Sequence, residues 1–269
     1  MIVCICILPL FQILMLSRIS DQFAAQQHLN DLAGDMVSDE TGLFEVMKFM
    51  GYRTASDGGK AVSTGTTIMA CEFDGGVVMA ADSRTSTGDY VANRTSRKIS
   101  RLSDRVFVLR SGSAADTQAL SSIVKKALDQ HCTELGASPT VNTTANLMRI
   151  IAYNNKDALT AGLIVGGWDC KRGGQVYAIP LGGTKLRKPV AIGGSGSGYI
   201  TGLVDHLYKP AMSKRECQSM VAKCVAHAMA RDGSSGGLIR MVTITESEVI
   251  EEVIYGDQIP FHLGRDVAE

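Results

Sequence analysis

The residues of this sequence best suited to chemistry are Gly65, Thr66 and Thr67, which stand directly before a β-rich run. A threonine hydroxyl is a poor nucleophile until a base lies within reach, and one such base is the residue's own α-amine. That amine exists only if the Gly65–Thr66 peptide bond is cut. Its unperturbed pKa of about 7.7–8 suits a general base at neutral pH. Because Gly-Thr-Thr is also an ordinary loop tripeptide, the downstream residues must decide between these interpretations.

A nearby cation would lower the pKa of both the amine and the hydroxyl, and Lys98 is the leading candidate. At about 4 Å and an effective dielectric constant of about 20, such a charge is worth up to about 4 kcal/mol. A buried ammonium needs a partner, and Asp82, which follows the apolar run 77–81, can supply it. The alternative is that Asp82 and Lys98 are unrelated charges at the ends of two strands.

An acyl-transfer site also needs donors for the oxyanion, and a strand that runs into a helix N-terminus presents free N–H groups. Residues 110–113, Arg-Ser-Gly-Ser, form such a junction, in which Gly112 would let the backbone approach a substrate. Strand alternation places Arg110 on the same face as Gly112, where a guanidinium would select acidic side chains. The alternatives are an ordinary strand-to-helix turn and an exposed arginine at a strand end.

Two further segments combine hydroxyls with glycines. Residues 231–237 read Arg-Asp-Gly-Ser-Ser-Gly-Gly, where Asp232 and Ser235 could hydrogen-bond a terminal amine and shuttle its proton. The alternative there is a helix C-cap and turn. Residues 193–198 read Gly-Gly-Ser-Gly-Ser-Gly, which superficially suggests phosphate binding. They lack the lysine of a P-loop and the βαβ setting of a dinucleotide fold, so we do not expect nucleotide binding.

The elements that position these residues follow from periodicity and turn signals. Asp74-Gly75-Gly76 predicts a hairpin, and Ser113 and Ser213, each with an acid three residues later, predict helix starts. The predicted strands are 67–73, 77–81, 98–102, 106–110, 162–168, 175–180, 238–245 and 249–255. The predicted helices are one that opens at 113, with apolar positions through 128, and those over 142–159, from 195 or 197 to 208, and over 215–231. Antiparallel hairpins alternating with blocks of helices predict an α+β fold, a four-layer αββα sandwich.

Composition excludes several classes of protein. The chain has 269 residues, 27 basic and 27 acidic, and is 45% hydrophobic, which suits one substantial domain. The balanced charge argues against a nucleic acid or a membrane as the main partner. The seven cysteines form no CxxC pair, which fits a reducing compartment, and Cys217 and Cys224 have the spacing of buried helix positions. The five histidines are scattered, so we expect no metal and no cofactor.

Residues 1–65 differ in character from the rest. Residues 2–16 are mostly apolar, but no Lys or Arg precedes them, and a good signal-peptidase site does not follow. The run is also short for a membrane span, and Met15 is an alternative initiator. From 21 to 60 the composition is acidic and polar and ends like a flexible linker. We expect a propeptide, 1–65, that is removed from a catalytic domain, 66–269.

Taken together, these residues resemble a catalytic β-type subunit of the proteasome core particle, within the N-terminal-nucleophile (Ntn) hydrolases. The resemblance covers most of the chain, from Thr66 to Asp257, and its motifs are specific in combination. They are 65–68 (Gly-Thr-Thr-Ile), 82–85 (Asp-Ser-Arg-Thr), Lys98, 110–116 (Arg-Ser-Gly-Ser-Ala-Ala-Asp), 166–169 (Gly-Gly-Trp-Asp), 194–197 (Gly-Ser-Gly-Ser) and 231–237.

The resemblance implies a role for each site residue. Thr66 would be the nucleophile and, through its amine, the base, once autolysis has cut the chain between Gly65 and Thr66. Lys98, paired with Asp82, would lower the pKa of the Thr66 amine and hydroxyl, and the Gly112 N–H would hold the oxyanion. The residues implied to support the amine are Ser195, Asp232 and Ser235. Those implied to line the pocket or pair with the substrate backbone are Thr85, Ser86 and Ala114.

Arg110 makes the resemblance closest to the subunit with caspase-like activity, a threonine endopeptidase that cuts after acidic residues. The resemblance also implies stacked heptameric rings built with other α and β subunits, an active site facing an enclosed chamber, unfolded polypeptide substrates, and a location in the cytoplasm and nucleus. Two alternatives stay open. A non-catalytic ring subunit would lack Thr66, Asp82 or Lys98, whereas all three are present. A free-standing Ntn amidohydrolase would need no ring contacts.

Overall fold

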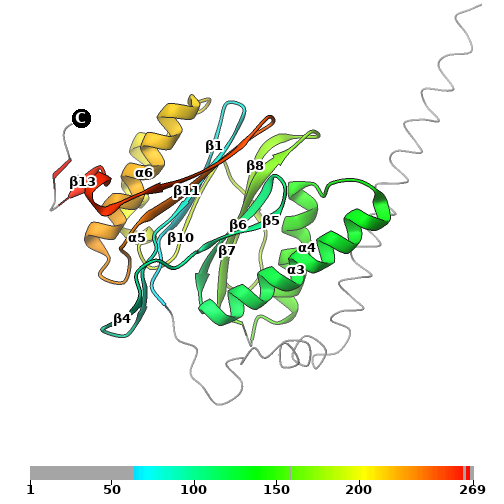
Figure 1. The fold of residues 1–269 in the computed structure, drawn as a ribbon, viewed down its shortest axis with the longest axis horizontal. Coiled ribbons are helices and arrows are strands. Elements are labelled where there is room, and N and C mark those ends of the chain that lie inside the picture. Colours follow the sequence, from blue (N-terminus) through cyan, green and yellow to red (C-terminus); the bar gives the residue numbers. More distant parts are fainter. Residues whose placement is uncertain (1–63, 158, 263–264, 267–269) are drawn as a thin grey trace, which may run out of the picture.

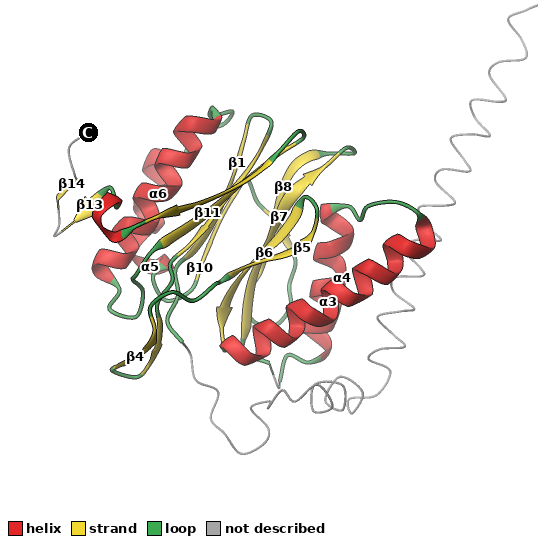
Figure 2. Ribbon diagram, in the orientation of Figure 1, coloured by secondary structure: helices red, strands yellow, loops and turns green. Residues whose placement is uncertain are grey.

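The structure is a computed structural model that describes residues 64–157, 159–262 and 265–266. Two antiparallel sheets are stacked on each other, and helices cover the outer face of each (Figures 1 and 2). The predicted αββα sandwich is therefore confirmed. The expectations for the apolar run, the linker and Met15 fall on residues 1–63, outside the described part of the chain.

The first sheet carries the candidate nucleophile at the start of its second strand. Its order is β10 (Val190–Gly193), β1 (Ile68–Phe73), β2 (Gly76–Ala81), β11 (Ile239–Thr245) and β12 (Val249–Ile254). The hairpin predicted at Asp74–Gly76 joins β1 to β2 with Ile68 opposite Ala81. This register places Asp82, the first residue after β2, directly beside Thr67, whose carbonyl accepts from the Asp82 N–H at 3.1 Å.

The second sheet carries Arg110 and Gly112. Its order is β5 (Ile99–Ser103), β6 (Val106–Gly112), β7 (Ala161–Asp169), β8 (Gly173–Ile179) and β9 (Leu186–Arg187). Alternation along β6 follows the prediction: Val106 and Val108 pack against the helices, whereas Phe107 and Leu109 lie between the sheets. Arg110 and Gly112 belong to the helix-facing set, toward α3.

Four helices form the outer layers: α3 (Ala114–Leu135) and α4 (Val141–Asn154) on the second sheet, α5 (Ser197–Leu207) and α6 (Lys214–Arg231) on the first. Ser213 and Glu216 complete a capping box at α6. At α3 the box is only half formed. Ser113 accepts from the Asp116 N–H at 3.4 Å, but the Asp116 carboxylate accepts from the Thr160 N–H at 3.2 Å.

The predicted end of one helix was wrong, and a helix start that the sequence left open is decided by the structure. Helix α4 ends at Asn154 and not at 159, because Asn155 leaves helical geometry and its side-chain amide donates to the Ile151 carbonyl at 2.9 Å. Asparagine competes with the helix for such backbone groups. Of the two predicted starts of α5, Ser195 and Ser197, the structure has Ser197, which leaves the Ser195 hydroxyl in the preceding loop, where it contacts Thr66.

Several short elements were not predicted. β3 (Thr85–Thr87) and β4 (Tyr90–Asn93) form a hairpin that projects from the sandwich, and near the C-terminus lie η1 (Gly256–Gln258), β13 (Phe261–His262) and β14 (Arg265–Asp266). Cys217 and Cys224 are buried as expected, and each of the five described cysteines is a free thiol. No described helix is long and apolar enough to cross a membrane.

Candidate active site

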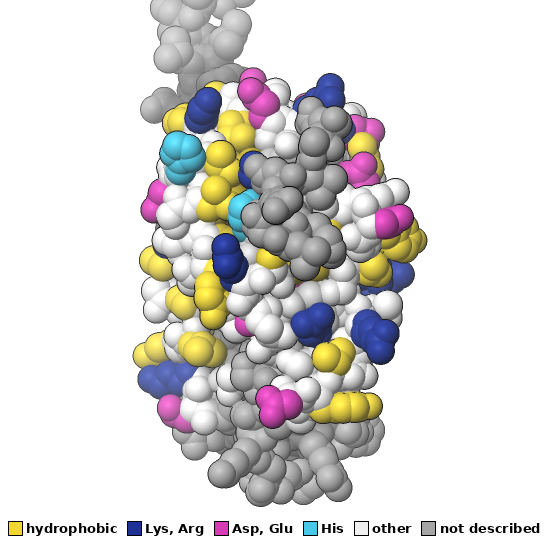
Figure 3. All heavy atoms as spheres, turned by 90° about the vertical axis from the view of Figure 1, so that its left-hand side faces the viewer, with side chains coloured by type: hydrophobic (Ala, Val, Ile, Leu, Met, Phe, Trp, Pro, Cys, Tyr) yellow, Lys and Arg dark blue, Asp and Glu magenta, His cyan; other side chains and the backbone are white. Residues whose placement is uncertain are grey.

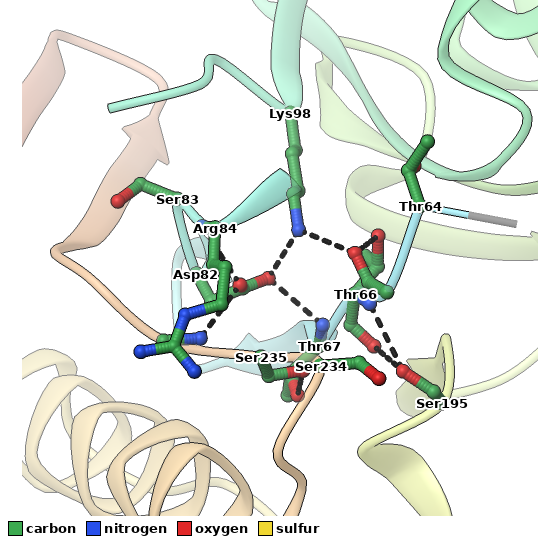
Figure 4. Close-up of polar contacts among 12 residues, drawn as sticks. Thr64, Thr66, Thr67, Asp82, Ser83, Arg84, Lys98, Ser195, Ser234 and Ser235 are labelled. Carbon is green, nitrogen blue, oxygen red and sulfur yellow. Dashed lines mark hydrogen bonds and ion pairs between the residues drawn. The ribbon is translucent and has the colours of Figure 1, made fainter. Parts of the chain in front are cut away.

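Thr66 lies at the entrance to β1, with 3% of its surface exposed, where the two sheets and the loop before α5 meet. The Gly65–Thr66 peptide bond is intact, and the Thr66 hydroxyl hydrogen-bonds the Gly65 carbonyl oxygen (Figure 4). The candidate nucleophile therefore already lies against the carbonyl of the bond that we expect it to cut.

Gly65 holds this arrangement through its backbone. Its φ of +62° is in the left-handed region that L side chains rarely adopt. A Cβ added to Gly65 would lie 2.4 Å from both the Cβ and the carbonyl oxygen of Ser234, closer than atoms pack. Both the dihedral angle and the available space therefore call for glycine before Thr66.

Lys98 and Asp82 form a buried ion pair next to this bond. The Lys98 ammonium is 2.8 Å from an Asp82 carboxylate oxygen and 2.8 Å from the Gly65 carbonyl oxygen (Figure 4). Burial lowers the pKa of Lys98 and raises the pKa of Asp82, and the attraction between the two charges counteracts each shift. The sequence prediction that these residues meet at Thr66 is correct in geometry.

Backbone groups complete the surroundings of Asp82. Its carboxylate accepts N–H hydrogen bonds from Thr67 at 2.9 Å, Arg84 at 3.1 Å and Gly236 at 3.0 Å. Such bonds favour the charged carboxylate and so keep a counter-charge beside Lys98. The sequence analysis did not predict these three contacts, because a backbone donor leaves no mark in residue type.

A chain of hydroxyls leads away from the Thr66 nitrogen. The Thr66 N–H donates to the Ser195 hydroxyl oxygen at 3.0 Å (Figure 4). Ser195 in turn donates to Asp232 at 2.7 Å. Ser235 donates to the same Asp232 oxygen at 2.6 Å and accepts from the Thr67 hydroxyl at 2.8 Å. All three predicted residues lie at the site. Ser195 contacts the Thr66 nitrogen directly, whereas Ser235 is bonded to Thr67.

Thr64, the residue before Gly65, hydrogen-bonds two residues that we expect to contact a substrate. The Thr64 carbonyl accepts from the Ser86 N–H at 3.1 Å, and the Thr64 hydroxyl donates to the Gly112 carbonyl at 3.0 Å. Gly112 has a φ of +101°, and a Cβ there would lie 2.3 Å from the Thr160 carbonyl oxygen. Ser86 and Gly112 therefore bind the chain's own backbone beside the bond to be cut. The proposed oxyanion role of the Gly112 N–H stays a prediction.

Arg110 lies in the wall of a pocket beside Thr66. Thr85 and Ala114 line the same pocket, as predicted, together with residues that the sequence analysis missed, among them Ser96, Arg97 and Gln118. Gln118 was detectable, since it lies one helical turn after Ala114 and so shares its face of α3.

The guanidinium of Arg110 is largely withdrawn from solvent, with 8% of the residue's surface exposed. One of its terminal nitrogens donates to the Arg97 carbonyl, whereas Nε has no hydrogen-bond partner. Burial lowers the pKa of this group. The interpretation of Arg110 as an exposed strand-end arginine is therefore wrong. The backbone N–H of Arg110 also donates to the Lys98 carbonyl at 2.9 Å, which ties the pocket wall to the ion pair.

The described residues contain no group of three or more His, Cys, Asp or Glu side chains that could hold a metal ion. The arrangement at Thr66 instead provides a hydroxyl, a polarised carbonyl, an adjacent ammonium and a relay of hydroxyls to a carboxylate. These are the parts of acyl transfer to a threonine. Fold and site together define the class as an αββα sandwich of the Ntn type.

Comparison with known proteins identifies the family. A family model described as proteasome subunit matches residues 62–244. Proteasome subunit beta type-6 of Arabidopsis thaliana is 53% identical over 197 residues, covering 73% of this chain and 84% of that protein. The Dictyostelium discoideum type-6 subunit is 52% identical, covering 74% of this chain and 94% of that protein. The human beta type-9 subunit is 51% identical, covering 74% of this chain and 90% of that protein. The chain belongs to the proteasome subunit family, on its β-type branch.

Proposed function

We propose that this chain is an active threonine endopeptidase of the proteasome core, matured by autolysis between Gly65 and Thr66. The observation that carries the proposal is the convergence of the Thr66 hydroxyl and the Lys98 ammonium on one carbonyl oxygen, that of Gly65. As a member of its family, the chain assembles with other proteasome subunits in the core particle and acts on polypeptides. A purely structural ring subunit would have no need of this convergence.

Maturation is an attack of the Thr66 hydroxyl oxygen on the Gly65 carbonyl carbon. The charge that develops on the carbonyl oxygen is stabilised by Lys98 Nζ, already 2.8 Å away. In the precursor the Thr66 nitrogen is an amide that donates to Ser195, so it cannot be the base. Lys98 in its neutral form, which burial favours by lowering the pKa, takes the hydroxyl proton, and the ammonium formed in this step is the cation that faces the developing oxyanion. The carbon–nitrogen bond breaks, the nitrogen takes a proton, and water then hydrolyses the ester.

Turnover repeats the chemistry with the freed amine as base. Substrate backbone takes the place of Thr64 between Ser86 and Gly112. The amine accepts the proton of the Thr66 hydroxyl, which attacks the substrate carbonyl, and the amine returns this proton to the leaving nitrogen. Hydrolysis of the acyl-enzyme restores the threonine. Ser195 and Asp232, hydrogen-bonded in sequence from the Thr66 nitrogen, orient the amine and can exchange protons with it.

We further propose caspase-like specificity, that is, cleavage after acidic residues. The relatives include both beta type-6 and beta type-9 subunits, so the support for this specificity comes from Arg110. A largely buried guanidinium with an unpaired Nε, in the wall of the pocket beside the nucleophile, favours a substrate carboxylate that completes its hydrogen bonds. We also propose that residues 1–65 are removed and that the protein acts in the cytoplasm and nucleus, in line with its free thiols.

Mass spectrometry of the purified core particle tests the proposal. We expect the mature chain to begin at Thr66, and we expect Thr66→Ala to retain its leader and to lose hydrolysis of peptides with an acidic residue before the cut. An active wild-type particle in which the leader is still attached would overturn the mechanism. Self-cleavage without hydrolysis of any peptide by the matured subunit would overturn the proposed endopeptidase.

A further inference from the structure

A second, larger cavity adjoins the pocket beside Thr66. Its volume is about 540 Å³, and its lining comes from the end of β4 and the segment after it, from β5 and β6, and from α3. The two cavities share four lining residues, Ser96, Arg97, Arg110 and Gln118, and so adjoin along a common wall. This space is far larger than one carboxylate needs, since a water molecule takes about 30 Å³ of the liquid.

The adjoining cavity is strongly cationic. Its charged lining residues are all basic, namely Arg97, Arg101, Arg110 and Lys125. Its hydroxyl and amide groups come from Thr95, Ser96, Ser100, Gln118, Ser121 and Ser122, among others. The α6 face of the molecule, by contrast, carries basic, acidic and hydrophobic side chains interspersed (Figure 3).

Most of this positive charge has no counter-charge in the described structure. Arg101 pairs with Asp104 at 3.0 Å, outside the cavity lining. Arg97, Arg110 and Lys125 form no ion pair with any described residue. A glutamate side chain of a substrate would neutralise one of these three cations. The chemistry of the cavity therefore matches a ligand group that carries more than one negative charge and more acceptor oxygens than a carboxylate.

We propose that the pocket accepts phosphoserine as the residue immediately before the cut bond, and that Arg97 and Lys125 recognise its phosphate together with Arg110. This proposal rests on the proposed function of Thr66 and extends its substrate class. The phosphorus atom of phosphoserine is as many bonds from Cα as the carboxyl carbon of glutamate, so both groups reach the same depth. At pH 7 the phosphate carries a charge of about −1.5 to −2 and offers three acceptor oxygens. Arginine matches such oxygens with two parallel hydrogen bonds.

The test measures cleavage by the assembled core particle in which the other catalytic threonines are replaced. Three fluorogenic peptides differ only in the residue before the cut: glutamate, phosphoserine or serine. We expect kcat/KM for phosphoserine to lie within about 10-fold of that for glutamate and at least about 10-fold above that for serine. Because the second phosphate pKa is about 6, we expect the phosphoserine-to-glutamate ratio to rise between pH 5.5 and about 7.5.

Variants then assign the recognition to this cavity. Lys125→Ala and Arg97→Ala should each lower the phosphoserine-to-glutamate ratio of kcat/KM by about 5- to 10-fold, since the phosphate has a second negative charge and a third acceptor oxygen that glutamate lacks. Lys126→Ala is the matched control, because Lys126 is an exposed neighbour on α3 outside the cavity lining, and it should leave the ratio unchanged.

The outcomes separate this proposal from the proposed function. Cleavage after glutamate with phosphoserine no better than serine would show a pocket for carboxylates alone, and would overturn the inference while leaving the endopeptidase intact. Equal ratios in the Lys125, Arg97 and Lys126 variants would also overturn it. Failure to cut any of the three peptides would refute the proposed function itself.

Discussion

Gly65→Ala should slow maturation without altering the mature enzyme. The φ of +62° at Gly65 costs a residue with a Cβ about 1–2 kcal/mol, and the new Cβ would lie 2.4 Å from Ser234 carbonyl and side-chain atoms. A strain of about 1–2 kcal/mol alone lowers the population of the reactive conformation about 5- to 30-fold. The overlap adds to this, because a shift of about 1 Å between reacting atoms can cost about 100-fold in rate. We expect conversion at least about 10-fold slower than in the wild type.

The assay follows loss of the leader in pulse-labelled cells by gel shift, with the mass of the new N-terminus as identification. Since Gly65 leaves with the leader, each matured subunit of the variant has the wild-type sequence and should show wild-type activity per processed chain. Gly233→Ala is the control in the same region, because a Cβ there meets nothing within 4 Å. Maturation of Gly65→Ala at the wild-type rate would refute the argument that the left-handed turn at Gly65 holds the carbonyl in place for attack.

Three further predictions follow from the described contacts. Lys98→Met should reduce autolysis at least about 100-fold by removing the cation at the Gly65 carbonyl. It should also lower the free energy of unfolding by about 3–5 kcal/mol, because Asp82 stays buried without its partner. Adding Asp82→Asn should restore stability but not activity, and a fully active Lys98→Met variant would contradict this role. Arg110→Met should weaken cleavage after glutamate by about 1–3 kcal/mol, the scale of a hydrogen bond to a charged group, whereas unchanged preference on fluorogenic peptides would remove Arg110 from the pocket. Burial raises the pKa of Cys224 from 9.0 to about 12, so above pH 9 the unfolded chain loses a proton that the folded chain keeps. Stability should therefore fall as pH rises from 9 toward 12, by up to about 1.4 kcal/mol per pH unit, and melting curves of Cys224→Ala with the same slope as wild type would refute this contribution.

Much of the fold could be predicted because its elements have strong local signals. The turn at Asp74–Gly76 has sequence-specific chemistry, and β1 and β2 are apolar throughout. The same turn also sets the register that brings Asp82 opposite Thr67, a consequence that the sequence analysis did not draw. The β3–β4 hairpin was missed because its strands are short and largely exposed, and so show no clear alternation of apolar residues.

The site was predictable where side-chain chemistry is unusual in its position. An aspartate after an apolar strand and a lysine at the next strand are costly to bury alone, and they are found paired. The three backbone donors to Asp82 and the direct link from Ser195 to the Thr66 nitrogen depend on how distant loops meet. Residue type says nothing about such contacts, because every residue except proline carries the same N–H group.

The pairing of Thr64 with Ser86 and Gly112 means that the newly made chain is the first occupant of its own cleft. An incoming polypeptide would have to compete with a segment that is covalently attached, and so present at a very high local concentration. If Thr66 acts as proposed, a cell that makes this subunit is protected from premature proteolysis by the segment before Thr66, until the irreversible cut between Gly65 and Thr66 releases it.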